Sequence, residues 1–472
     1  MPIVFPSDLM VSVSGFRGRV GAPLTPELMS ALAAGFGAFL RKEALEGEGG
    51  EGGEGPYPTV LVGRDSRTSG PMFVRSVVAG LQSVGCRVVD LGMVPTPTLM
   101  LAVEESDAAG GIGVTASHNP GEWNALKFAS GAGLFLDALV MADFQGYLQT
   151  QDPPRASWEA LGTVVRDSQA VDRHLERILT LPWLNVPALK ERRFRVALDC
   201  VNGAGAVIMP QLLEALGCEV HGLAMEPHGR FARDPEPTAK NLAELGRGVE
   251  RSGADLGLAV DPDVDRLSLV DGQGSPLGED LTLALASAAV LRRRPGPVVT
   301  NLSTSQVVED VARSFDCPVV RAPVGEINVA RRMQKEGAMV GGEGNGGVIL
   351  PELHLTRDAP LGAALILQHL LDEGVGLAEA AAAWPRYVIE KRKVAFPREA
   401  LEGAYRALAE DFSAPDVDRS DGLRLAWPEE RVWLHVRPSG TEPVVRLISE
   451  APTAQESGGL LDRASGLLLG LV

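Results

Sequence analysis

Short apolar segments alternate along the chain with longer stretches in which apolar residues recur every three or four positions. The short segments predict strands at Thr59–Val62, Arg87–Asp90, Ile112–Val114, Phe194–Asp199, Leu256–Val260, Val298–Asn301 and Ala338–Gly341. The longer stretches predict helices at Pro26–Leu40, Met72–Val84, Val207–Leu216 and Ser305–Ser314. Strands and helices that alternate in this way indicate an α/β fold.

The last part of the chain has a different pattern. Val432–Val436 alternates as a strand does, Val444–Ile448 follows after a turn, and Ala454–Leu468 predicts a helical tail. This combination indicates a small C-terminal α+β domain. Candidate domain boundaries lie near Asp152–Pro154, at Asp271–Gly278 and across Gly374–Pro385.

Length and composition narrow the class of protein. The 472 residues allow three or four domains at roughly 100–200 residues each. A net charge of -17 argues against general binding to nucleic acid or to anionic membranes, so an anionic ligand needs a local cluster of arginines and backbone N–H groups. The apolar stretch Leu281–Leu291 is too short to span a bilayer, which takes about 20 residues. The four cysteines fit no zinc or disulfide framework, and we expect a cytoplasmic protein.

Thr115–Pro120, called the serine loop below, directly follows the predicted strand Ile112–Val114. A serine at a strand end, before a polar turn, is well placed to be an exposed nucleophile. These residues are also typical of an ordinary turn that ends a strand. A Ser-His hydrolase is a weaker interpretation, because G-x-S-x-G is absent and because Ser117 and His118 would point to opposite faces of an extended chain.

Asp261–Arg266, the aspartate loop, follows the predicted strand Leu256–Val260. In an extended chain the carboxylates of Asp261, Asp263 and Asp265 project to one side, where their repulsion calls for a cation. Hard oxygen ligands suit Mg²⁺. An EF-hand would need a glycine and a glutamate where Arg266 and Gly272 stand, so we reject that alternative.

Two further loops carry candidate ligand groups. Arg437–Pro443, the arginine loop, joins two hydroxyl groups and a glycine to Arg437, with Arg446 nearby, and this combination suits a phosphate better than an ordinary hairpin turn. Gly341–Gly347, the glycine loop, contains G-x-G-x-x-G but is followed by Val-Ile-Leu-Pro, which cannot start the helix of a dinucleotide site. It would instead present Glu343 and Asn345 as hydrogen-bonding groups.

These motifs, in this order, resemble the α-D-phosphohexomutase family, in which a phosphoserine moves a phosphate between C6 and C1 of a hexose. Ser14–Gly18 and Gly63–Arg67 are similar to two further family segments, and the matches extend from Ser14 to Arg446. The resemblance implies four domains around a central cleft, three α/β and a smaller α+β domain. We place them at residues 1–153 with the serine loop, 154–272 with the aspartate loop, 273–378 with the glycine loop and 379–472 with the arginine loop.

The resemblance also implies roles for individual residues. Ser117 would be the phosphorylated nucleophile and, with Asp261, Asp263 and Asp265, would hold Mg²⁺. The other catalytic residues would be Lys127, near the transferred phosphate, with Arg17 and His118 beside the phosphoserine. Substrate would be bound by Arg266, Glu326, Glu343, Asn345, Arg437, Ser439, Gly440, Thr441 and Arg446. Ala125 departs from the family's usual glycine before the lysine turn.

The expected partners are hexose phosphates, with hexose 1,6-bisphosphate as activator, and neither nucleic acid nor membrane. The protein would be a monomer or homodimer. Glu326, which follows Val324-Gly325, resembles the acid of phosphoglucosamine mutases and could pair with an amino group, or it could be only a capping carboxylate. Glucosamine phosphate is therefore the expected substrate, with phosphomannomutase/phosphoglucomutase activity as the alternative. A phosphatase and a non-catalytic sugar-phosphate binding protein are the remaining alternatives.

Overall fold

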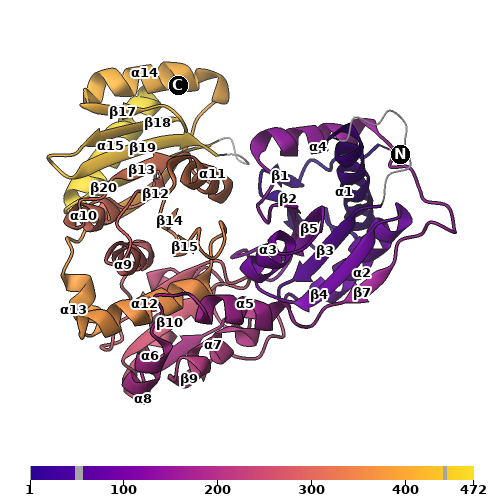
Figure 1. Ribbon diagram of the computed structural model, residues 1–472. Helices are drawn as coiled ribbons and strands as arrows, with labels where there is room; N and C mark the ends of the chain where they lie inside the picture. The colour runs from indigo at the N-terminus through magenta and orange to yellow at the C-terminus, as the bar shows by residue number, and fades with distance from the viewer. Residues whose placement is uncertain (1, 48–56, 440–443, 472) are drawn as a thin grey trace. The chain divides into compact units, whose positions relative to one another are not determined.

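The computed structural model describes residues 2–47, 57–439 and 444–471 (Figure 1). It divides into two compact units. The first comprises the described residues up to Glu279 together with Gly347–Ala378, and the second comprises Asp280–Gly346 and the described residues from Glu379 onward. Among the described helices, none combines the length and the apolar character needed to cross a membrane.

The first unit begins with a seven-stranded mixed sheet. Its strands lie in the order β1 (Met10–Ser12), β2 (Gly15–Arg19), β6 (Trp123–Ser130), β5 (Gly110–Val114), β3 (Thr59–Arg64), β4 (Arg87–Met93) and β7 (Val164–Arg166). The associated helices are α1 (Pro26–Gly47), α2 (Gly70–Ser83), α3 (Thr96–Glu104), α4 (Ala138–Thr150) and α5 (Ala170–Leu179). The parallel part of the sheet ends at the serine loop, between β5 and β6.

Successive side chains of β3 pack alternately into two cores, one on each face of this sheet. Val60 and Val62 belong to the core that includes Phe36 of α1 and Phe144 of α4. Leu61 points the other way and packs in the core that contains Leu99 of α3. A strand buried on both faces reads as a continuous apolar run, which is why Thr59–Val62 shows no polar alternation.

A second sheet in the first unit carries the aspartate loop. Its strands lie in the order β11 (Leu267–Val270), β10 (Leu256–Val260), β8 (Arg195–Asp199) and β9 (Glu219–Leu223), and only β11 is antiparallel. The other elements of this part are α6 (Val186–Arg192), η1 (Ala204–Val207), α7 (Met209–Ala215), η2 (Ala239–Asn241), α8 (Ala243–Ser252), β15 (Gly347–Ile349) and α12 (Ala359–Glu373). The aspartate loop is the connection from β10 to β11.

The second unit contains one parallel and one antiparallel group of strands. The parallel strands lie in the order β13 (Val319–Ala322), β12 (Val298–Asn301) and β14 (Val340–Glu343), with α9 (Asp280–Leu291), α10 (Val307–Ser314) and α11 (Glu326–Glu336). The antiparallel sheet lies in the order β16 (Val388–Ala395), β20 (Val444–Ala451), β19 (Val432–Pro438), β18 (Leu423–Trp427) and β17 (Asp416–Asp418). Its helical elements are η3 (Arg398–Ala400), α14 (Leu401–Phe412) and α15 (Ala454–Gly470), and α13 (Leu377–Ala382) precedes β16.

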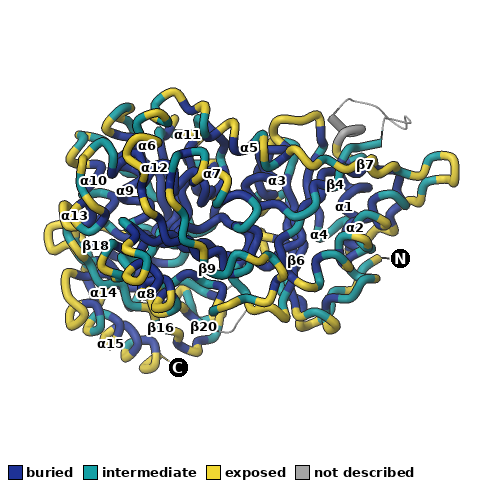
Figure 2. Tube along the Cα trace, turned by 90° about the horizontal axis from the view of Figure 1, so that it is seen from below, coloured by how far each residue is buried: buried dark blue, intermediate teal, exposed yellow. Residues whose placement is uncertain are grey.

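The predicted strands and helices are present, several with shifted ends, and two of these shifts are informative. The helix predicted at Val207–Leu216 is confirmed as α7, but a 3₁₀ turn at Ala204–Val207 precedes it and the α-helix starts at Met209, with Pro210 in its first turn. Proline lacks an N–H group and therefore suits a helix start rather than its interior. The predicted strand Ala338–Gly341 is shifted to Val340–Glu343, so Glu343 ends a strand rather than lying in the loop. Figure 2 shows the central strands largely buried and many connections exposed, while the edge strands β7 and β17 are mostly exposed.

Candidate active site

The serine loop places Ser117 against the aspartate loop. The Ser117 Oγ donates a 3.0 Å hydrogen bond to Oδ2 of Asp261, which lies 144 positions later in the sequence. The prediction of an exposed serine was wrong, since Ser117 is only 4% exposed. The chain turns inward there because Ser117 has a left-handed backbone, with φ of 49°.

The side chain of His118 lies on the same side as that of Ser117. Its Nδ1 is 3.4 Å from the Ser117 Oγ, so the expectation that the two side chains point to opposite faces was wrong. The left-handed backbone of Ser117 breaks the extended geometry on which that expectation rested. The positive charge of Arg266, burial, and the charge of Arg17 lower the pKa of His118 to about 2, so its imidazole is neutral at physiological pH.

The aspartate loop is a tight turn and not the extended chain that the sequence predicted. Val264 has a positive φ of 66°, and its N–H donates to the carbonyl of Asp261 at 3.2 Å. The turn still brings the three carboxylates together: one oxygen of each lies within 4.8 Å of the others, and all three residues are fully buried. The turn, rather than the alternation of side chains along a strand, therefore creates the acidic cluster.

The three carboxylates have different electrostatic surroundings. Burial, followed by the charges of Asp265 and Asp263, raises the pKa of Asp261 well above its usual range. Burial acts in the same direction on Asp263, but Lys127 and Thr96, each 2.8 Å from its Oδ2, outweigh burial and hold the pKa of Asp263 well below its usual range. Asp263 therefore carries a negative charge at neutral pH.

The donor set fits a divalent cation. Oδ1 of Asp263 and Oδ1 of Asp265 are buried and have no hydrogen-bond partner within the described residues. Oδ2 of Asp261 faces the serine hydroxyl. Buried carboxylate oxygens without partners are costly, and a hard cation such as Mg²⁺ would satisfy them with the oxygen ligands it prefers.

The remaining predicted residues of the first unit border this cluster. Arg17, on β2, donates from Nη1 to Asn119 Oδ1 at 2.6 Å, and burial lowers its pKa. Lys127, on β6, forms the ion pair with Asp263. The Nε of Arg266 lies 3.7 Å from Asp265 Oδ1. The structure thus brings every predicted catalytic and metal residue into one region of the first unit.

Three residues with contacts in this region were missed as site residues. Thr96, at the start of α3, bonds Asp263, and Arg357, just before α12, donates from Nη2 to Asp265 Oδ2 at 2.5 Å. Arg67 hydrogen-bonds the backbone of the serine loop. Arg67 stands in the Gly63–Arg67 segment, which could have drawn attention to it. Thr96 and Arg357 carry no comparable signal in the sequence.

In the second unit, hydrogen bonds of Glu343 connect the glycine loop with the loop before α11. Oε1 of Glu343 accepts from Asn301 Nδ2 at 2.8 Å and from the N–H of Gly325 at 3.1 Å. The Asn345 amide lies 3.4 Å from the other carboxylate oxygen of Glu343. Glu326 is the first residue of α11 and is buried, a position where the helix N-terminus itself favours a carboxylate. Both the capping and the sugar-binding interpretation of Glu326 fit this position.

The arginine loop begins at the end of β19. Arg437 forms an ion pair with Asp421, with Nε 3.0 Å from Oδ2, and Arg446 stands directly opposite Arg437 on β20. Like charges on directly opposed strand positions destabilise a sheet, and an anion would relieve them. Ser439 is buried at the end of β19. Gly440 and Thr441 lie outside the described residues.

Comparison with known proteins identifies the family. Sequence models of the phosphoglucomutase/phosphomannomutase α/β/α domains I, II and III and of its C-terminal domain match residues 9–151, 172–274, 278–387 and 391–465. A probable phosphoglucosamine mutase of Methanopyrus kandleri is 38% identical, with 95% of each chain covered. A phosphoglucomutase/phosphomannomutase of Thermococcus kodakarensis is 35% identical over 96% of this chain and 97% of its own.

A solved structure supports the same assignment. The phosphoglucomutase/phosphomannomutase family protein of Burkholderia thailandensis is 25% identical and superposes with a TM-score of 0.84, over 99% of this chain and 98% of its own. The chain belongs to the phosphoglucomutase/phosphomannomutase family and has its four-domain fold of three α/β domains and a C-terminal α+β domain. It is a phosphohexomutase, an isomerase of hexose phosphates. The domain boundaries drawn from the sequence stay a prediction.

Proposed function

We propose that this phosphohexomutase interconverts hexose 6-phosphates and hexose 1-phosphates through a phosphoserine at Ser117 and a hexose 1,6-bisphosphate intermediate. The observation that carries the proposal is the 3.0 Å hydrogen bond from Ser117 Oγ to Asp261, inside a buried cluster of three carboxylates. A buried serine hydroxyl in contact with a cation site is suited to phosphoryl transfer, since the cation would neutralise the phosphate that the serine carries.

The reaction consists of two successive phosphoryl transfers, each of a different phosphoryl group. The phosphoserine P–O bond breaks as a sugar hydroxyl oxygen bonds to phosphorus, which gives the bisphosphate and free Ser117. The bisphosphate then turns over, and its other phosphoryl group bonds to the Ser117 Oγ as the sugar oxygen leaves. In the first step the sugar hydroxyl loses its proton and the leaving Ser117 Oγ gains one, and in the second step the Ser117 hydroxyl loses that proton and the leaving sugar oxygen gains one. Lys127 is our candidate for relaying the proton within each step, while Arg17 and Arg266 balance phosphate charge.

Mg²⁺ bound by Asp261, Asp263 and Asp265, together with a phosphoserine oxygen, would supply electrostatic stabilisation of the transferring phosphoryl group. The ion pair between Lys127 and Asp263 keeps Asp263 ionised, which favours metal binding at neutral pH. Arg437, Ser439, Gly440, Thr441 and Arg446 would hold the phosphate that is not reacting. The opposed pair Arg437 and Arg446 supports this assignment, because an anion between them would remove their repulsion.

Glucosamine phosphate is the proposed substrate. In the second unit Glu326 begins α11 and Glu343 ends β14, and the N–H of Gly325, next to Glu326, donates to Glu343. Two carboxylates close to a sugar site would favour an ammonium group over a neutral hydroxyl. Several relatives are named phosphoglucosamine mutases, and one from Sulfurisphaera tokodaii is named a phosphoglucosamine/phosphogalactosamine mutase. The alternative is mannose or glucose phosphate, as the name of the Thermococcus kodakarensis relative has it.

The test is ³¹P NMR of the protein with Mg²⁺ and a trace of hexose 1,6-bisphosphate. Glucosamine, mannose and glucose 1-phosphates are supplied separately, and we expect the 6-phosphate signal to grow fastest with glucosamine. Release of inorganic phosphate alone would instead indicate a phosphatase. The matched control is Ser117→Ala, which should abolish transfer with every sugar. Wild-type turnover in that variant would refute the phosphoserine mechanism.

A further inference from the structure

One buried arginine holds the backbone of the serine loop. Arg67 is fully buried, and its Nη2 donates to the carbonyls of Ser117 and Asn119, each at 2.6 Å. Its Nη1 donates to the carbonyls of Pro120 at 2.6 Å and Trp123 at 3.0 Å. A guanidinium carries five N–H donors in a rigid fork, so three of these contacts hold the serine loop and the fourth holds Trp123, the first residue of β6.

The fifth donor fixes the arginine itself. Nε of Arg67 donates to Oδ2 of Asp65 at 3.0 Å, and the same oxygen accepts the hydroxyl of Thr115 at 2.7 Å. The hydroxyl oxygen of Thr115 in turn accepts the N–H of Ser117 at 3.0 Å. Through Arg67 and Thr115, the carboxylate of Asp65 is therefore connected to both the carbonyl and the N–H of the nucleophile residue.

The conformation held in this way is one that a serine rarely adopts. The left-handed φ of 49° at Ser117 turns its side chain toward Asp261, and residues with a Cβ enter that region only when their surroundings enforce it. The bonds to the Ser117 carbonyl and N–H are the enforcing contacts. We propose that Arg67 is the positioning residue that sets the Ser117 Oγ for phosphoryl transfer, an inference that rests on the proposed role of Ser117 as nucleophile.

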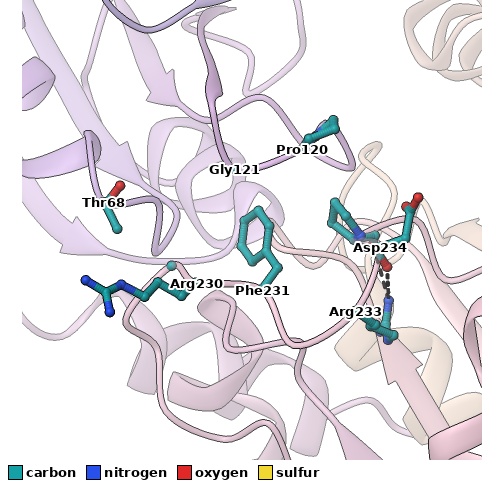
Figure 3. Close-up of a pocket in the computed structure, with 9 residues that line it drawn as sticks. Thr68, Pro120, Gly121, Arg230, Phe231, Arg233 and Asp234 are labelled. Carbon is teal, nitrogen blue, oxygen red and sulfur yellow. Dashed lines mark hydrogen bonds between the residues drawn. The ribbon is translucent and has the colours of Figure 1, made fainter.

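The loop at Gly229–Pro235 covers this arginine. The guanidinium of Arg67 lies over the ring of Phe231, 5.0 Å from its centre, and Figure 3 shows Phe231 next to the Pro120–Gly121 segment in a cavity of about 590 Å³. Gly229 permits the close approach, since a Cβ there would come within 2.2 Å of the Ser66 carbonyl. The aromatic ring limits the access of water to the guanidinium, so water competes less for the loop carbonyls.

The test is Arg67→Lys, which keeps the positive charge and loses the five-donor fork. A displacement of about 1 Å at a reacting atom costs roughly 100-fold in rate, so we expect kcat to fall by about that factor with KM nearly unchanged. The second measurement is the single-turnover rate at which hexose 1,6-bisphosphate phosphorylates the protein, followed by intact-mass spectrometry. We expect it to fall by the same factor, because the loss lies in the transfer step.

The control variant is Arg424→Lys, which changes another buried arginine, one that belongs to the second unit and lies over Trp433. It should keep the wild-type phosphorylation rate per folded molecule. If Arg67→Lys does not fold, Asp65→Asn replaces it: this nearly isosteric change weakens the bond that fixes Arg67 and should also slow phosphorylation, by roughly tenfold.

The outcomes separate the two proposals. Turnover of substrate by Ser117→Ala would refute the role of Ser117 as nucleophile, and with it the basis of this inference. If Ser117→Ala is inactive while Arg67→Lys, or its replacement Asp65→Asn, is phosphorylated at the wild-type rate, the positioning role of Arg67 is overturned and the phosphoserine mechanism stands. A higher KM with unchanged kcat in Arg67→Lys would also overturn it, since that pattern indicates lost substrate binding.

Discussion

Replacing Arg357 by methionine should make the stability of the protein depend strongly on the metal. Arg357 is 7% exposed and donates to Asp265 Oδ2 at 2.5 Å, while Asp265 is fully buried. Without Arg357, the buried charge of Asp265 loses its nearest compensation. Removing one partner of a buried ion pair costs about 3–5 kcal/mol, so we expect a loss of that size in the free energy of unfolding in EDTA.

Mg²⁺ should restore part of the free energy of unfolding that Arg357→Met loses. A divalent cation on Oδ1 of Asp265, which has no hydrogen-bond partner among the described residues, compensates the same charge that Arg357 compensates. The variant should therefore gain more stability from Mg²⁺ than the wild-type protein gains. Ligand at a hundredfold excess over Kd stabilises by about 2.7 kcal/mol, and tighter binding to the variant would add to that figure. The measurement is urea unfolding, followed by tryptophan fluorescence, with EDTA and with saturating Mg²⁺.

Two further variants make the test specific. Arg173→Met breaks the surface ion pair with Asp167, in which Arg173 is 43% exposed, and should cost at most about 1 kcal/mol with or without metal. The double variant Asp265→Asn with Arg357→Met removes both charges and should be more stable in EDTA than Arg357→Met alone. An equal loss for Arg357→Met in EDTA and in Mg²⁺ would refute the reasoning, because it would show that Arg357 does not compensate the metal-site carboxylate.

Three shorter predictions concern a second carboxylate of the cluster, the arginine loop, and a buried histidine of β19. Asp263→Asn should weaken Mg²⁺ binding by at least roughly tenfold in isothermal titration calorimetry, and an unchanged Kd would exclude Asp263 as a ligand. Arg437→Met should raise KM by about 10–100-fold through loss of a charge-assisted hydrogen bond to phosphate, and an unchanged KM in steady-state assays would exclude that contact. Burial lowers the pKa of His435 to about 4, below the roughly 6.5 of an unfolded histidine, so stability should fall as the pH drops between these values, by ~2 kcal/mol from pH 8 to pH 5. His435→Gln should flatten that pH dependence in urea unfolding, and an equally steep loss would assign the effect to other groups.

The pattern of apolar residues predicted most of the elements because each sheet of the first unit has strands buried in continuous apolar runs. Thr59–Val62 and Leu256–Val260 are such runs, and each is a strand in the structure. Element starts were less predictable where a proline decides them, as at Pro210. The sequence pattern does not show whether a turn of irregular backbone precedes the helix, because the 3₁₀ turn at Ala204–Val207 has the same small apolar residues as a helix.

The candidate site shows a different limit. Motif order was enough to select Ser117, Lys127 and the three aspartates, which the structure then brings into one buried cluster. The extended-chain argument used for the aspartates reached the right grouping by the wrong geometry, since Val264 adopts a left-handed conformation that reverses the chain. Side-chain periodicity applies to regular strands, and these loops lie just beyond the strand ends, where it no longer holds.

The contacts of Arg67 are an example of what the sequence alone does not predict. An arginine in a polar segment ordinarily reads as a solvated surface residue, and charged residues are almost never fully buried unless they are paired. Its partners are backbone carbonyls of the serine loop and of Trp123, about fifty positions away. Any residue type could provide these carbonyls, so no sequence pattern predicts the contacts. The proposed positioning role of Arg67 rests on the left-handed backbone of Ser117, and that backbone angle becomes visible only once the loop is folded against its arginine. In this protein, motifs can therefore indicate the groups that do the chemistry, while the groups that orient them must be found from the hydrogen bonds of the folded chain.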